Sequence, residues 1–156
     1  KKAEREMDHR VSVIKAIAAH GSTESIAVLS KDLFTKPDPK VTAARILAIG
    51  NIRSVASVEA LIGMMKVAGP HRVQPHMDEL RLALLVLTGI DQGKSQEQWT
   101  RWWNESKKDY TVLPVVPQLS KEDARRWYGF LDQRPMYERQ EKRGERGSDP
   151  EGGKEL

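Results

Sequence analysis

The 156-residue sequence contains no cysteine, so the chain has no disulfide bonds and no thiolate for nucleophilic or metal chemistry. It also has no apolar run of about eighteen residues, the length that a membrane-spanning helix needs. We therefore expect no membrane span. A cysteine-free domain suits the cytoplasm and the periplasm equally, so the compartment stays open.

Sequence signatures of catalysis are missing as well. The chain has no nucleophile elbow, no phosphate-binding loop and no carboxylate pair with the spacing of a general acid–base site. Among its four histidines, His71 and His76 flank an expected loop, match no metal-ligand spacing and are predicted to be solvated. We therefore predict no catalytic, cofactor-binding or metal-binding residues and no enzyme activity.

Composition is that of a soluble domain with a modest core, since 38% of the residues are hydrophobic and 31% are charged. The net charge of +4 is a mild excess that permits an anionic partner without indicating one. The sequence begins at Lys1, without methionine or a signal-peptide core. We expect a processed or partial chain, which leaves open whether a targeting signal or upstream repeats have been removed.

Apolar residues recur at intervals of three and four along most of the chain, the spacing of amphipathic helices. The predicted helices span residues 4–20, 23–34, 39–50, 55–68, 75–88, 96–108 and 120–136, with a loop at 70–75. Two prolines and several β-branched residues predict an extended strap at 111–119. The charged, glycine-containing stretch 137–156 is predicted to be disordered.

Local signals mark the ends of these helices. Ser and Asp, which favour helix N-caps, precede four of them at Ser22, Asp38, Ser54 and Ser95. Glycines that favour helix C-termini follow three of them at Gly21, Gly50 and Gly89. Ser95 and Gln98 have the spacing of a capping box, in which each side chain bonds the backbone amide of the other residue.

Three of the four tryptophans lie close together on one predicted helix. Trp99, Trp102 and Trp103 occupy positions i, i+3 and i+4, so their rings share a face. We interpret this face as a structural cap, because clustered tryptophans at helical spacing usually belong to a core. This interpretation places Trp102 partly over Leu113, Val115 or Trp127. The alternative is an aromatic platform for a base, a sugar or a proline-rich peptide.

The sequence contains an internal repeat. Five positions match others 32 residues later, namely Ala16 with Ala48, Ile17 with Ile49, Ser22 with Ser54, Ile26 with Val58 and Leu29 with Leu61. Gly50 in turn matches Gly89. Repeats of this length predict three stacked helix pairs, each of which buries its apolar stripe on the next pair.

The stretch from Ala48 to Leu61 resembles the turn of a HEAT repeat, in which a helix end like Ala48-Ile49-Gly50 leads into a second helix. The segment from Leu87 to Trp103 is similar to the ending of many bacterial HEAT-repeat proteins, where Leu-Thr-Gly and a short turn precede a W-x-x-W-W helix. The resemblance covers about residues 10–108 and implies an all-α, armadillo-like fold. It implies a short right-handed α-solenoid of about three helix pairs in a domain over 4–110.

The resemblance also implies a non-catalytic protein–protein interaction or scaffold module within a larger assembly or a longer chain. We expect the partner, whose identity stays open, to bind a concave face formed by the second helix of each pair. The candidate interaction residues there are Glu24, Lys31, Glu59, Lys66 and Arg101. Neither the oligomeric state nor the docking of the strap, on this chain or on a partner, follows from the sequence.

Two alternative functions remain. Basic residues of a helical repeat align into a nucleic-acid-binding stripe if the repeat geometry places them on one face. The candidates are Arg45, Arg53, Lys66, Arg72, Arg81, Lys94, Arg101, Lys107 and Lys108. Interleaved acidic residues favour a mixed, solvated surface instead. The third function is an accessory or lyase-type subunit, since HEAT-like repeats also occur in bilin lyases.

Overall fold

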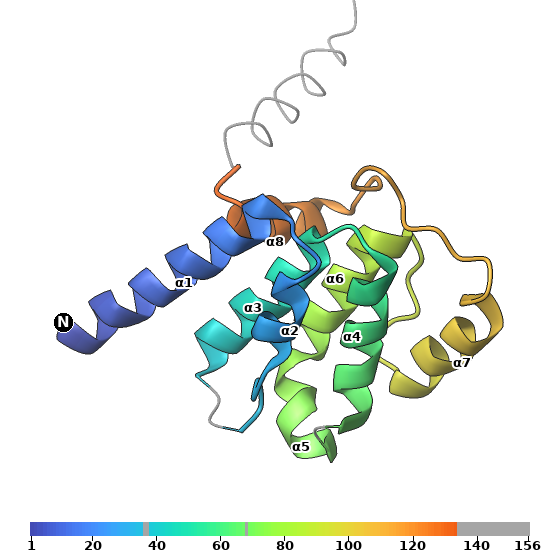
Figure 1. The fold of residues 1–156 in the computed structure, drawn as a ribbon, viewed down its shortest axis with the longest axis horizontal. Helices are drawn as coiled ribbons and strands as arrows, with labels where there is room; N and C mark the ends of the chain where they lie inside the picture. Colours follow the sequence, from blue (N-terminus) through green and yellow to red (C-terminus); the bar gives the residue numbers. More distant parts are fainter. Residues whose placement is uncertain (36–37, 68, 134–156) are drawn as a thin grey trace, which may run out of the picture. The chain divides into compact units, whose positions relative to one another are not determined.

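The computed structural model describes residues 1–35, 38–67 and 69–133 (Figure 1). All regular secondary structure in these ranges is helical, so the predicted all-α class is confirmed. The predicted disorder of 137–156 lies outside the described residues, as do the last residues of the predicted helix 120–136. None of the described helices is both long and apolar enough to cross a membrane.

The chain divides into two compact units, of which the first comprises Lys1–Leu119. The second begins at Ser120 and contains one described helix, α8 (Lys121–Phe130). The hydroxyl of Ser120 caps this helix by accepting a hydrogen bond from the Asp123 backbone amide at 3.2 Å. The local sequence therefore accounts for the start of α8.

Local signals also set the C-terminal end of α1 (Lys2–His20) and the start of α3 (Pro39–Asn51). Gly21 follows α1 with a φ of 70°, the left-handed conformation predicted for it. Asp38 caps α3 by accepting hydrogen bonds from two backbone amides, and Pro39 opens the first turn. The N-terminal half of α1 is largely exposed, and its Asp8 pairs with Lys40 of α3 at 2.8 Å (Figure 1).

Helix α2 (Ser25–Ser30) is shorter than the predicted helix 23–34. The Ser22 side chain does not cap it, since Glu24 occupies the N-cap position without a side-chain hydrogen bond. At the other end, Arg45 of α3 donates through Nε to the Leu29 carbonyl at 2.8 Å. Its guanidinium also bonds the carbonyls of Val28 and Lys31. A residue of another helix therefore satisfies the C-terminal carbonyls of α2.

The predicted loop at 70–75 is wrong. After α4 (Val55–Val67), the chain forms α5 (Gly69–Val73) and a 3₁₀ turn η1 (Gln74–His76), which leads into α6 (Met77–Thr88). Both prolines stand in the first turn of a helical segment, where the missing N–H costs nothing. Val73 is buried, so tertiary packing stabilises a segment that lacks helical periodicity.

His76, predicted to be solvated, is also buried, with 5% of its surface exposed. Its ring lies 6.2 Å from the ring of Phe34, measured between centroids. His71 is exposed, as predicted. The two histidines therefore do not share a loop environment, because His71 lies in α5 and His76 ends η1, where it is buried.

Helix α3 lies at the centre of the first unit, where it packs against α1, α2, α4 and α6. Helix α4 additionally packs against α2, α6 and α7 (Gln96–Ser106). The contacts therefore connect α1, α3 and α6 in one row and α2, α4 and α7 in another. The largest fully buried aliphatic side chains come from these central helices and the turn after α3: Ile46, Ile49, Ile52, Val58, Leu61, Ile62, Leu80, Leu82, Leu84 and Leu87.

Gly50 does not end α3, contrary to the interpretation that it is a helix-terminating glycine. It lies inside the last turn of α3 and is buried against α6. A Cβ added at Gly50 would stand 2.7 Å from Ala83 Cβ and 2.9 Å from Ala83 Cα. Glycine is therefore required here for the close approach of two helices. Gly89, its match in the repeat, has a φ of 72° and ends α6 as predicted.

Candidate functional site

The turn before α7 fixes where this helix begins. Asp91 accepts a hydrogen bond from the Gly93 backbone amide at 2.8 Å, and Arg81 of α6 donates through Nε to both of its carboxylate oxygens at 3.0 and 3.1 Å. The hydrogen bond from Arg81, aided by the Gly93 amide, lowers the pKa of Asp91 below its ordinary value. This pair therefore connects the start of α7 to α6.

Helix α7 begins with one half of the predicted capping box. The Ser95 hydroxyl accepts from the Gln98 backbone amide at 3.3 Å. In the described structure, the exposed Gln98 side chain does not return the bond to Ser95. A single cap is sufficient here because Trp99 also anchors the turn, donating through Nε1 to the Gly93 carbonyl at 2.8 Å.

The tryptophans form the aromatic cluster that the sequence predicts. Trp99 is fully buried and Trp103 is 7% exposed, whereas Trp102 is half-buried. The Trp102 ring meets Tyr110 edge-to-face at a centroid distance of 5.3 Å, and Trp103 meets Tyr110 at 5.6 Å. Burial raises the pKa of the Tyr110 phenol. Since two of the three rings are inaccessible, the cluster fits a structural role better than a stacking platform.

Trp102 was predicted to lie partly over Leu113, Val115 or Trp127, but the ring that meets it from the segment after α7 is Tyr110, and Val115 is 69% exposed. Leu113 lies against the end of α6, where its side chain would approach a Cβ at Gly89 to 2.8 Å. The Leu113 amide donates to the Leu87 carbonyl at 3.2 Å, and its carbonyl accepts from Arg53 at 2.9 Å. The segment 111–119 therefore docks on this chain.

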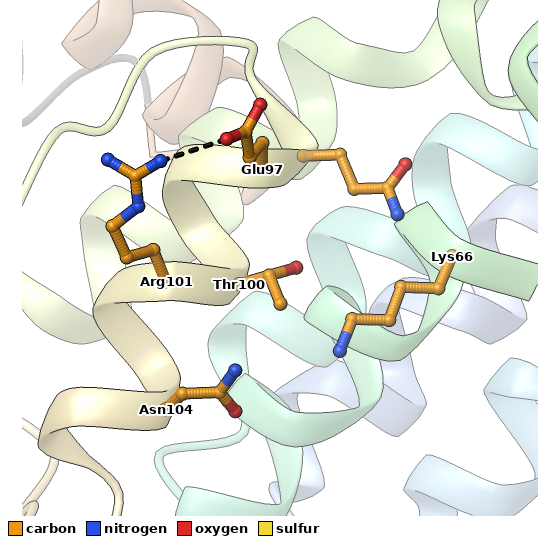
Figure 2. A pocket seen from close by; sticks show the side chains of 6 residues that line it. Lys66, Glu97, Thr100, Arg101 and Asn104 are labelled. Carbon is orange, nitrogen blue, oxygen red and sulfur yellow. Dashed lines mark hydrogen bonds and ion pairs between the residues drawn. The ribbon is translucent and has the colours of Figure 1, made fainter.

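An open groove of about 680 Å³ lies between α4 and α7. Six polar residues line it: Lys66, Gln96, Glu97, Thr100, Arg101 and Asn104. Figure 2 shows Lys66 of α4 reaching toward Thr100 and Asn104, which come from successive turns of α7. Arg101 pairs with Glu97 at 2.8 Å along α7. We call this the α4–α7 groove.

Two of the five predicted interaction residues line the α4–α7 groove. Lys66 and Arg101 come together there, whereas Glu24, Lys31 and Glu59 are exposed but do not line it. The sequence interpretation missed four lining residues of α7: Glu97 and, on successive turns, the three residues Gln96, Thr100 and Asn104. Their spacing of four was a signal, because it places them on one face beside the tryptophans.

Most of the predicted basic stripe has structural partners. Arg45 and Arg53 bond backbone carbonyls, and Arg81 pairs with Asp91. Lys94 pairs with Asp78, and Arg101 with Glu97. Of the nine cations in the predicted stripe, four are exposed and lie outside these contacts: Lys66, Arg72, Lys107 and Lys108. The stripe therefore does not present a continuous run of cations for a phosphate backbone.

Within the described ranges, no three His, Asp or Glu side chains gather as a metal ion would require. No protein-family model, no curated protein and no solved structure matches the chain. The α4–α7 groove and the tryptophan cluster are therefore interpreted from their own geometry.

Proposed function

We propose that this protein is a non-catalytic interaction module that binds another protein through the α4–α7 groove. The groove carries the proposal, because it joins Lys66 of one helix to five polar side chains of another. These side chains supply hydrogen-bond donors and acceptors, both charged and neutral. Such a mixture suits a transient polar contact with a polypeptide.

We also propose that the helices form a short HEAT-like solenoid. The contacts that connect α1, α3 and α6 in one row and α2, α4 and α7 in another support this arrangement. The aromatic cluster then closes the last helix pair. In this arrangement the α4–α7 groove lies between the second helices of two successive pairs, where neighbouring repeats create continuous binding surfaces.

A protein partner is favoured over a nucleic acid by the charge of the groove. Glu97 neutralises Arg101 at a distance of 2.8 Å, which leaves Lys66 as the other cation that lines the groove. Binding of a nucleic acid needs several cations along a phosphate backbone and falls steeply with salt. The partner contact is therefore expected to weaken with salt far less steeply than binding of a nucleic acid would.

Site-specific photo-crosslinking tests the proposal. A photoreactive residue replaces the exposed Asn104 in the full chain, and irradiation is carried out in cells of the source organism. One crosslinked protein is expected, and the added substitution Lys66→Glu should reduce it. The matched control carries the photoreactive residue at Ala19, an exposed position on α1. Equal capture from both positions, or capture of nucleic acid alone, would contradict the proposed function.

A further inference from the structure

The polar side chains of the α4–α7 groove form a regular row along α7. Gln96, Thr100 and Asn104 stand at positions i, i+4 and i+8, all of them lining the groove. Successive members are therefore about 6 Å apart along the helix axis. An extended polypeptide repeats its backbone groups on one side every second residue, at about 6.6 Å. The two spacings agree closely enough for the three side chains to contact three successive backbone groups of an extended segment.

The three side chains are also available for hydrogen bonds. Neither the Gln96 nor the Asn104 amide makes a side-chain hydrogen bond in the described structure, and both residues are exposed. The Thr100 hydroxyl oxygen is buried and makes none either. Rotation about χ1 of Thr100 moves the hydroxyl between three staggered positions, one of which the methyl group now occupies. An occupant that bonds this hydroxyl removes an unsatisfied buried group.

The lining selects the conformation of the occupant. A helical partner uses its backbone groups internally, so only its side chains could bond the polar groups of the six residues that line the groove. An extended segment instead offers free N–H and C=O groups, which amide side chains bind in pairs. Lys66 lies opposite the row and has no ion pair, whereas Arg101 is neutralised by Glu97. The remaining positive charge favours an acidic side chain in the occupant.

We infer that the α4–α7 groove binds an extended peptide segment of a partner protein. Its backbone bonds Gln96, Thr100 and Asn104, and its Asp or Glu side chain pairs with Lys66. This inference rests on the proposed function and specifies the chemistry of the partner at the same groove.

The test begins with a random twelve-residue peptide library displayed on phage and selected against the full chain. The selected peptides are expected to be enriched in Asp or Glu. Binding of a synthetic selected peptide is then measured by fluorescence anisotropy. Thr100→Val and Lys66→Gln should each weaken it about fivefold or more, as expected for loss of one hydrogen bond or one charge contact. The matched controls Thr111→Val and Lys2→Gln, at exposed positions outside the groove, should leave it unchanged.

N-methylation of the peptide backbone distinguishes an extended occupant from a helical one. Removal of single N–H groups should weaken binding at every second position, because alternate groups face α7. The inference is overturned if no peptide is enriched, if the groove variants bind like the parent, or if the loss on N-methylation has no period of two. An oligonucleotide that competes with the peptide would also overturn it. If photo-crosslinking from Asn104 still captures a protein in these cases, the proposed function survives and only the extended-peptide inference fails.

Discussion

The two faces of α7 differ in what they contact. One face carries Trp99 and Trp103, which are almost fully buried among aromatic and aliphatic side chains. The other presents Gln96, Thr100 and Asn104 to the open α4–α7 groove. The difference shows that a single helix can separate stability from recognition, since substitutions on the two faces should change different measurable quantities.

The largest effect is expected on the tryptophan face. Trp99→Ala and Trp103→Ala should each lower the free energy of unfolding by about 3–5 kcal/mol, because each leaves a large cavity and Trp99 also loses its bond to Gly93. Urea denaturation followed by circular dichroism measures the change. Trp102→Ala is the comparison, and its half-buried ring should cost less. A Trp103→Ala variant that unfolds like the parent would refute the structural role of the cluster.

Gly50 provides a second contrast between tight and open packing. Gly50→Ala should destabilise the protein by about 1–3 kcal/mol, because the new Cβ overlaps Ala83 of α6. Gly63 is the matched control, since it lies inside α4 with no atom within 4 Å of an added Cβ. Gly63→Ala should therefore stabilise the protein by about 0.5–1 kcal/mol through helix propensity. Thermal denaturation of both variants tests the contrast, which equal shifts would contradict.

The sequence was sufficient where the determinant is local. The caps at Asp38 and Ser95 and the left-handed Gly21 and Gly89 were all predicted from a few neighbouring residues. The buried tryptophans followed from helical spacing alone. In each case the determining atoms lie within one turn of the residue, so no knowledge of the tertiary packing was required.

The features that were missed depend on residues far apart in the sequence. Arg45 determines where α2 ends, and Arg53 donates a hydrogen bond to the carbonyl of Leu113, 60 positions away. Gly50 looks like a helix terminator until its approach to Ala83 is known. The groove required the packing of α4 on α7, so only Lys66 and Arg101 were identified beforehand and their juxtaposition was not.

The turn that anchors α7 should contribute a smaller, pH-dependent effect. Asp91→Asn keeps an acceptor for the Gly93 amide but loses the charge that pairs with Arg81. Because the Asp91 side chain is 42% exposed, we expect a loss of only about 0.5–1 kcal/mol at pH 7. Thermal denaturation measures it, with Asp109→Asn at an exposed position as the control.

The pKa of Asp91 determines the pH at which this contribution disappears. Since its folded-state pKa is lowered from 3.8, ionised Asp91 stabilises the fold above that value. The stabilisation is lost as the pH falls through the lowered folded-state pKa. The parent and Asp91→Asn should therefore differ in stability near neutral pH and converge below about pH 4. A difference that stays constant down to about pH 2 would refute the ion pair as its cause.

The smallest loss of stability is expected on the groove face of α7. Thr100→Val retains the shape of the side chain and removes a buried hydroxyl that makes no hydrogen bond, so the free energy of unfolding should stay the same or rise by about 1 kcal/mol. Lys66→Gln should change it by less than about 0.5 kcal/mol, because Lys66 is exposed and forms no ion pair. Urea denaturation of both variants and of Trp103→Ala compares the free energies of unfolding for substitutions on the two faces of α7. If Thr100→Val unfolds as readily as the tryptophan variants, this face of α7 contributes to the core and the groove no longer qualifies as a binding surface.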